Sequence, residues 1–365
     1  MQGKNTIVFV TGKNPGAAEL VSKEINEDKD FVSVAVPFDS LVSKPKIFFG
    51  KTKRVLNNHV WKPVSAVLHK VFRSIKVAET MRSYDGGKKQ SVHNMIYRFS
   101  PTVLVVSEPY VLFSLSENLK SMGKKANLFV FSNDIGFRFD LIHDNVLHYF
   151  VDNINVRNQL LQKGIFADKI DVNPLPINSA FFEEKDRDDI RQKMGIGKTS
   201  KVVLVCPNEK NGKSLAAFAA EHADRYTFVA LCDAVLKEIF EEKGVTCFPF
   251  AREENVYAAC DVVLSGYDPY AIKKAAALRK TSVVYGDGNE TIEHLVAERK
   301  IRWCEEETDA ERTLVDLFAQ KKPTTEDDEA ESEPVFDETD EKSAIEIADR
   351  MKELVGAMTK EEERY

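Results

Sequence analysis

The chain has 365 residues, of which 43% are hydrophobic and 30% charged, with a formal net charge of −7. These proportions are typical of a soluble globular protein with room for two domains. No apolar run is long enough for a membrane-spanning helix, and the early run Ile7-Val-Phe-Val predicts a strand rather than a secretory signal. The five cysteines are odd in number and form no CxxC pair, which argues against structural disulfides and a zinc cage and indicates a reducing cytoplasm.

Short β-branched runs alternate with helical patterns along the first half. We expect strands at residues 7–11, 32–36, 102–106, 128–131, 149–151 and 169–172, and helices at 17–25, 111–122 and 156–163. Alternation of this kind predicts a parallel sheet covered by helices on both faces. Two prolines at 174–178 interrupt the pattern.

The same rhythm restarts in the second half, with strands expected at 202–206, 227–231, 246–248, 261–264 and 282–285 and helices at 213–221, 234–242, 271–278 and 291–297. Two doubly wound units fit this length better than one wide sheet. We therefore predict an α/β fold of the GT-B type, with two Rossmann-like domains, 1–175 and 176–322, facing across a cleft. An acidic linker, 323–342, then leads to a C-terminal helix, 343–365, that packs back on the first domain.

Charge is unevenly distributed. Residues 40–78 contain nine Lys or Arg and no acid, whereas residues 323–341 contain ten acids and no base. Apolar residues from Val64 to Ile75 recur on one helical face of the basic segment, with Lys70, Arg73 and Lys76 off this face, which favours an interfacial helix on anionic lipid. The cations expected to contact the membrane surface are Lys51, Lys53, Arg54, Lys70 and Arg73. Alternatively, this stripe faces the core. Nucleic acid is a poorer partner for a chain that is otherwise acidic.

Ligands of doubly wound sheets bind beyond the carboxyl ends of the strands, where helix N-termini attract phosphate. Gly12 and Gly16 follow the first strand and could approach a ligand closely, or form a plain turn. Gly266 and Asp268 follow the strand ending at residue 264, and Asp268 could equally be a helix cap.

The turn after residue 285 contains Asp287, Gly288, Asn289 and Glu290, which could hold an anion or sugar hydroxyls, or cap a helix. Asp134 follows another buried strand and is a candidate general base, with capping as the alternative role. The seven histidines show neither HxH nor HExxH spacing, so we expect no metal site.

Residues 146–195 resemble the diacylglycerol glycosyltransferases and monogalactosyldiacylglycerol synthases. The resemblance is carried by Tyr149-Phe-Val, by Gly164-Ile-Phe-Ala-Asp-Lys-Ile and by Asn173-Pro-Leu-Pro-Ile through Phe182, which match motifs of that family in order and spacing. Weaker similarity covers most of residues 5–320. The resemblance to this family implies the GT-B fold, a basic insertion that docks on membranes and a C-terminal helix that returns to the first domain.

The departures from the family fall on its catalytic loops. The first loop lacks the family's catalytic histidine, and Pro207-Asn-Glu-Lys-Asn-Gly replaces its second glycine-rich loop. Lys274 stands where the family has a donor-binding glutamate, whereas Glu290 matches its later Gly-Gln-Glu motif. An ammonium only donates hydrogen bonds, so Lys274 could pair with a diphosphate but not bridge ribose hydroxyls.

Two main readings remain open. In the first, the chain transfers a sugar from a nucleotide donor to a lipid hydroxyl at the cytoplasmic membrane face, with no cofactor beyond the donor substrate. The resemblance implies that this donor is linked to UDP. In the second, it is a catalytically degenerate GT-B protein that binds a membrane or partner, such as a second transferase subunit. A sugar-nucleotide epimerase of the same fold is a third possibility.

Overall fold

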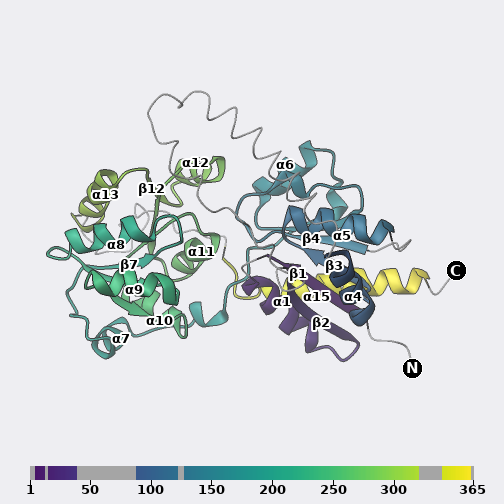
Figure 1. Cartoon of the computed structure of the whole chain (residues 1–365), viewed down its shortest axis with the longest axis horizontal. Coiled ribbons are helices and arrows are strands. Elements are labelled where there is room, and N and C mark those ends of the chain that lie inside the picture. Colours follow the sequence, from purple (N-terminus) through teal and green to yellow (C-terminus); the bar gives the residue numbers. More distant parts are fainter. Residues whose placement is uncertain (1–4, 13–14, 39–87, 122–126, 320–338, 363–365) are drawn as a thin grey trace, which may run out of the picture. The chain divides into compact units, whose positions relative to one another are not determined.

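The computed structural model describes residues 5–12, 15–38, 88–121, 127–319 and 339–362. The basic segment 40–78 and most of the acidic linker lie outside these ranges. The chain divides into two compact units (Figure 1). Unit 1 comprises Met1–Asn133, Phe137–Asn173 and Ala344–Tyr365, and unit 2 comprises Asp134–Gly136 and Pro174–Ser343.

Unit 1 is built on six parallel strands in the order β2-β1-β3-β4-β5-β6. Its elements in chain order are β1 (Asn5–Thr11), α1 (Gly16–Asn26), β2 (Phe31–Pro37), α4 (Lys88–Phe99), β3 (Val103–Val106), α5 (Pro109–Ser121), β4 (Asn127–Phe131), η1 (Phe139–Leu141), β5 (Val146–Val151), α6 (Ile154–Gln162), η2 (Ala167–Lys169), β6 (Ile170–Val172) and α15 (Ser343–Glu362). The order reverses direction between β1 and β3, which makes this pair the topological switch point of the sheet.

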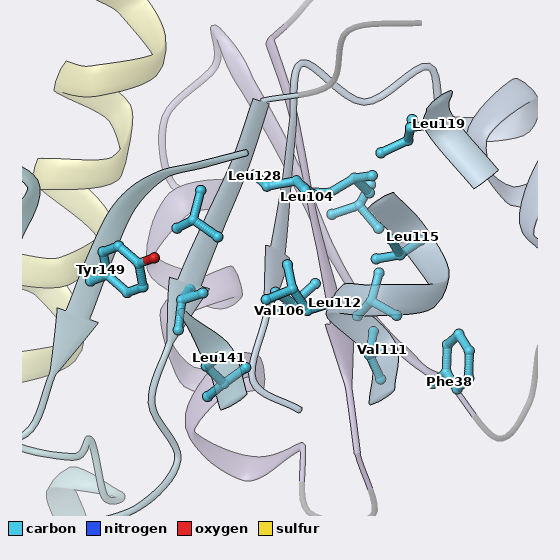
Figure 2. Packing of buried hydrophobic residues seen from close by; sticks show 14 of the residues in the cluster. Phe38, Leu104, Val106, Val111, Leu112, Leu115, Leu119, Leu128, Leu141 and Tyr149 are labelled. Carbon is cyan, nitrogen blue, oxygen red and sulfur yellow. The ribbon is translucent and has the colours of Figure 1, made fainter. Parts of the chain in front are cut away.

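Alternate side chains of the strands form the core of unit 1 on the face covered by α4, α5 and α6. Leu104 and Val106 of β3 point toward Val111, Leu112 and Leu115 of α5 (Figure 2). These side chains are at most 1% exposed. Burying each of them contributes roughly 1.5–3 kcal/mol relative to exposure to water, so this face is a major source of stability.

The C-terminal helix α15 belongs to unit 1, where it is drawn in yellow in Figure 1. Its apolar side chains Ile347, Met351 and Val355 are completely buried. Arg350 Nε donates to Asp171 Oδ2 at 2.9 Å, and Thr359 Oγ1 bonds to Asn5 Oδ1 at 3.0 Å. The helix is thus tied to both β6 and β1.

Asp171 lies at the centre of this attachment. His148 Nε2, from a side chain only 3% exposed, is 2.6 Å from the same carboxylate oxygen that Arg350 contacts. Burial alone would raise the pKa of Asp171, but hydrogen bonds and charges from His148 and Arg350 hold that pKa below its usual value. The ionised carboxylate is therefore the form that the fold stabilises.

Unit 2 has six parallel strands in the order β12-β11-β10-β7-β8-β9. Its elements are η3 (Ser179–Phe181), α7 (Arg187–Lys193), β7 (Val202–Cys206), α8 (Gly212–Glu221), β8 (Thr227–Leu231), α9 (Ala234–Glu242), β9 (Thr246–Phe248), α10 (Glu253–Ala259), β10 (Val262–Ser265), α11 (Pro269–Ala277), β11 (Thr281–Tyr285), α12 (Glu290–Ala297), β12 (Arg302–Cys304) and α13 (Glu307–Ala319). Helices α8, α9 and α13 pack on one face, and α10 and α11 on the other. The switch point lies between β7 and β10.

The predicted α/β architecture of two doubly wound sheets is confirmed, and every expected strand is present. Helices α4, α7, α10 and α13 and strand β12 were not predicted from the sequence. Helix α7 lacks an apolar stripe because the side chain that it buries is Arg191. The Arg191 guanidinium donates to Asp261 Oδ2 and to Ala259 O, both at 2.8 Å. Within the described residues no helix combines the length and apolarity that crossing a membrane requires.

The two units meet in sequence at Asn173 and Pro174, close to the expected boundary of 175 and 176. One short segment differs from the expectation. Asp134–Gly136 falls within the range assigned to the first domain, yet it belongs to unit 2. The physical reason is that Ile135, 3% exposed, packs in an apolar cluster with Ile272 and Ile292 of unit 2.

Candidate functional site

The carboxyl edge of the unit 2 sheet carries three helix N-termini side by side. Strands β7, β10 and β11 are neighbours, and each is followed by a short turn and a helix, α8, α11 or α12. Helix N-termini present free N–H groups and the positive end of the helix dipole. This edge is therefore suited to an anionic ligand, and the switch point between β7 and β10 marks its centre.

Two asparagines organise the turn after β7. Asn208 N donates to Asn211 Oδ1 at 2.8 Å, and Asn208 Oδ1 accepts from the backbone of Lys210 and Asn211 at 2.9 and 3.2 Å. Both side-chain amides lie against Gly266 at the end of β10. A Cβ on Gly266 would collide with Asn208 Nδ2 and lie 2.6 Å from Asn211 Nδ2. Gly266 thus allows the two turns to approach each other.

Gly266 was predicted from the sequence as a site residue, but neither asparagine was. Two asparagines three residues apart, shortly after a buried strand, are the pattern that could have identified them. The loop was instead judged only by its lack of the glycines expected from the resembling family. Asp268 is an N-cap of α11, since its Oδ1 accepts from Tyr270 N at 3.0 Å. Capping was the alternative role expected for it.

Lys274 projects from the second turn of α11 toward α10. Its Nζ lies 2.6 Å from Glu253 Oε1, with 18% of the lysine side chain and 20% of the glutamate side chain exposed. The same Nζ lies 5.6 Å from the centre of the Phe181 ring, within range of a cation–π contact. A carboxylate is therefore present beside the lysine, although it comes from a helix that the sequence reading did not contain.

Cys206 and Tyr257 lie next to these charges. Their Sγ and hydroxyl oxygen are 3.4 Å apart. Burial, which outweighs the opposing effect of the hydrogen bond with Tyr257, raises the pKa of Cys206 to about 12. The thiol is consequently protonated at neutral pH, and Cys206 is not a nucleophile.

The turn after β11 forms as a strand-to-helix connection. Gly286 has φ of +119°, a conformation that favours glycine. Trp303 Nε1 donates to Gly286 O at 2.9 Å, and a Cβ on Gly288 would lie 2.8 Å from Trp303 Cζ2. Asn289 caps α12 by accepting from Ile292 N at 2.9 Å. Asp287, Gly288, Asn289 and Glu290 are all exposed, although the side-chain oxygen of Asn289 is engaged in this cap.

Asp134, the candidate general base, is bonded within unit 2. Its Oδ1 accepts a short hydrogen bond from the Tyr267 hydroxyl and another from Gly136 N at 3.3 Å. Burial and the Asp134 charge raise the pKa of Tyr267, so the phenol keeps its proton. A Cβ on Gly136 would collide with Thr291 Oγ1 of α12, which fixes this segment closely against unit 2.

Unit 1 has a polar edge of its own at its switch point. Gly12 follows β1, and Gly16 is the exposed first residue of α1. Glu108, which follows β3, lies directly against Gly12, because a Cβ there would be 2.8 Å from both Glu108 Cγ and Glu108 Oε1. Arg138 NH1 donates to Glu108 Oε2 at 3.2 Å. The sequence reading did not select Glu108.

Gly266 and Asp268 therefore lie at the β7/β10 switch point and the turn 287–290 follows the next strand, β11, whereas Lys274 lies further along α11 against Glu253 of α10. Gly12 and Gly16 belong to unit 1. In the part of the chain that the structure describes, no three potential metal ligands gather in one place.

Comparison with known proteins agrees with this architecture. No family model matches the chain. The processive diacylglycerol beta-glucosyltransferase of Bacillus licheniformis is 23% identical over 204 residues, which cover 52% of this chain and 52% of that protein. The chain thus matches about half the length of this relative. The predicted resemblance to the diacylglycerol glycosyltransferases is confirmed, as that of a divergent relative.

Solved structures cover nearly the whole chain. MnaA of S. aureus in complex with UDP superposes with a TM-score of 0.62 at 11% identity, covering 96% of this chain and 97% of that one. A UDP-GlcNAc 2-epimerase from Neisseria meningitidis bound to UDP-GlcNAc gives a TM-score of 0.55 at 14% identity, covering 97% and 100%. The chain has the GT-B fold. About half of the chain is also similar in sequence to a diacylglycerol glucosyltransferase.

Proposed function

We propose that the chain binds a nucleoside diphosphate sugar, with UDP as the nucleotide, at the carboxyl ends of β7, β10 and β11. The observation that carries this proposal is that Asn208, Asn211 and Asp268 lie at the β7/β10 switch point, where doubly wound sheets bind their ligands. The two solved structures of this fold named above contain UDP-GlcNAc and UDP, which supports the proposal.

The chemistry of the site fits a diphosphate. The N-termini of α8 and α12 would donate backbone N–H groups to phosphate oxygens, and Lys274 would supply a cation. The exposed carboxylates Asp287 and Glu290 would accept hydrogen bonds from sugar hydroxyls, as a carboxylate has only acceptor sites when ionised. Under this proposal the reaction uses no resident cofactor besides the donor substrate.

We further propose that the acceptor is a lipid hydroxyl, with diacylglycerol as the first substrate to examine. This choice follows the described activity of the B. licheniformis relative. The basic segment 40–78 would hold the protein on the anionic cytoplasmic face of the membrane as a peripheral protein. This segment lies outside the described residues, so its support is its composition alone.

A transfer assay tests the reaction. The full chain is incubated with radiolabelled UDP-glucose or UDP-galactose and with vesicles of phosphatidylglycerol containing dioleoylglycerol, and the lipid fraction is separated and counted. The proposal predicts label in a glycosyl-diacylglycerol, and much less label with Gly266→Ala. Label that stays in the nucleotide sugar with both donors would contradict the transferase activity.

Vesicle co-sedimentation tests the membrane claim separately. Binding should require phosphatidylglycerol and weaken as salt rises, because screening shortens the range of the attraction. Replacing Lys51, Lys53, Arg54, Lys70 and Arg73 together with Gln should abolish it. Unchanged binding of this variant would contradict the claim that the basic segment binds the membrane.

The second candidate function is a degenerate GT-B protein that binds a membrane or a second transferase subunit. The observation that favours it is the neutralisation of Lys274 by Glu253 at the donor position. This reading predicts no transfer in the assay above and no binding of UDP. An epimerase, in contrast, would consume UDP-GlcNAc without any lipid, which the same assay detects when the nucleotide sugars are analysed.

A further inference from the structure

Two cysteines of unit 2 lie with their sulfur atoms in contact. Cys232 directly follows β8, and Cys247 is the central residue of the neighbouring strand β9. The register pairs Ala230 with Cys247, so Cys232, two residues beyond Ala230, lies on the same face of the sheet. Both cysteines are free thiols, and their Sγ atoms are 3.8 Å apart. The strand pairing thus brings together two thiols that are 15 residues apart in the chain.

The pair can become a disulfide after a small movement. A disulfide holds its sulfur atoms about 2.05 Å apart, so the two Sγ atoms must come about 1.8 Å closer than their present 3.8 Å. Cys232 lies past Leu231, the last paired residue of β8. Cys247 lies in a three-residue strand at the end of the strand order, between the exposed residues Thr246 and Pro249. Both segments can therefore share the movement.

Cys247 is the thiol that an oxidant reaches first. It is partly exposed, whereas Cys232 is only 8% exposed. Burial raises the pKa of Cys247, and the hydrogen bond that Cys232 donates opposes this shift, because a donor favours the thiolate. Burial also raises the pKa of Cys232, to about 12. Both thiols are therefore protonated at neutral pH, so their oxidation is slow unless the oxidant is abundant.

A series of close contacts joins Cys232 to the nucleotide site proposed above. Helices α8 and α9 lie side by side in unit 2 (Figure 1). Asp233, next to Cys232, caps α9 by accepting from Leu236 N at 2.9 Å. Leu236 packs against the first residue of α8, since a Cβ on Gly212 would collide with Leu236 Cδ2. Gly212 N donates to Asn208 O at 2.9 Å, in the turn after β7. A shift of Cys232 therefore reaches the N-terminus of α8, because a closely packed interior transmits strain.

We propose that Cys232 and Cys247 form a reversible disulfide that lowers the affinity of the nucleotide site in unit 2. The effect on affinity rests on the proposed function, whereas formation of the bond does not. Disulfides that form in a reducing compartment are usually transient and catalytic or redox-sensing. This pair would be a sensor, because its oxidation displaces the N-terminus of a helix that the proposed site uses to bind phosphate.

The oxidant is a small disulfide such as oxidised glutathione, and the exchange balances in two steps. The Cys247 thiolate attacks one sulfur of this molecule, which forms a mixed disulfide and releases one glutathione thiolate. The Cys232 thiolate then attacks the Cys247 sulfur, and the second glutathione leaves as a thiolate. The two released thiolates take up the two protons that the cysteines lost. The protein is oxidised by two electrons, and one small disulfide is reduced to two thiols.

Mass spectrometry of the full chain tests formation of the bond. The protein is incubated with excess oxidised glutathione, remaining thiols are alkylated under denaturing conditions, and the digest is analysed. The proposal predicts peptides joined through Cys232 and Cys247 that dithiothreitol separates, while Cys206, Cys260 and Cys304 are recovered alkylated. Alkylation of both thiols of the pair, or glutathione retained on Cys247 without the internal bond, would overturn the proposal.

Calorimetric titration with UDP tests the effect on the site, on reduced, oxidised and re-reduced protein. The dissociation constant should rise by about tenfold or more on oxidation, the size of effect expected when one hydrogen bond to a charged phosphate is lost. Reduction should restore the original affinity. Equal affinities of the reduced and the disulfide-bonded protein would overturn the proposed effect. A reduced chain that binds no UDP would instead contradict the proposed function, and the effect on affinity would fall with it.

Two variants assign the effect to this pair. Cys247→Ser should bind UDP with the affinity of the reduced wild type, before and after treatment with the oxidant. Cys304→Ser is the matched control, since Cys304 is a buried thiol whose Sγ lies 3.3 Å from Thr313 Oγ1, a contact that a serine hydroxyl can keep. This control should lose affinity on oxidation as the wild type does. An equal loss of affinity in oxidised Cys247→Ser would contradict the assignment.

Discussion

Lys274 of α11 and Glu253 of α10, 21 residues apart in the chain, form an ion pair with 2.6 Å between Nζ and Oε1. The charge that the resembling family carries on α11 is reversed here, and the opposite charge is supplied by α10. The pair is four-fifths buried, so its geometry has consequences for stability as well as for ligand binding.

Reversing one member of this pair should destabilise the protein. Lys274→Glu would set two carboxylates against each other and remove the cation near Phe181, and breaking a largely buried pair costs about 2–4 kcal/mol. Adding Glu253→Lys should restore most of the loss. Thermal denaturation of the single and double variants measures both effects. Lys193→Glu, in an exposed pair with Asp189, is the control, and a single variant no less stable than this control would contradict the prediction.

Gly266→Ala should weaken nucleotide binding more than it weakens the fold. The added methyl group would collide with the Asn208 and Asn211 amides and displace the turn that precedes α8. We expect a tenfold or greater rise in the UDP dissociation constant, corresponding to about 1.4 kcal/mol. Calorimetric titration measures it. Gly356→Ala, where an added Cβ meets nothing within 4 Å, is the control, and equal affinities of the two variants would count against the site.

Acid should release the attachment of α15. Because His148 and Arg350 hold the pKa of Asp171 below its unfolded value of about 3.9, the ionised carboxylate stabilises the folded state above that pH, and this contribution is lost as pH falls further. Asp171→Asn should therefore lower the free energy of unfolding by about 1 kcal/mol at pH 6, since the groups are about one-third exposed. The difference should vanish near pH 2. Urea titrations across this range test it, and a difference independent of pH would contradict the account.

The sequence predicted the strands well because parallel strands are buried on both faces and appear as β-branched runs, as in β7 and β10. It missed β12, a short edge strand containing Arg302 and Trp303. It also missed α7, whose buried side chain is an arginine. These elements are recognisable only through their partners, such as Asp261, 70 residues away from Arg191.

The same distinction applies to the site. Gly266, Asp268 and the turn 287–290 could be predicted because each directly follows a strand. Glu108 and Glu253 could not, since their importance depends on strand order and helix neighbours that only the fold defines. Gly12 meets Glu108 because β1 and β3 are adjacent, although helix α4 and more than 80 residues separate them in sequence.

The most direct test of the central claim is calorimetric titration of the full chain with UDP, followed by thermal denaturation with and without the nucleotide. The account predicts saturable binding of one UDP per chain and a melting temperature that rises with UDP concentration, because a ligand that binds only the folded state stabilises it. Absence of binding heat together with an unchanged melting temperature would contradict a nucleotide-sugar site at the carboxyl ends of β7, β10 and β11.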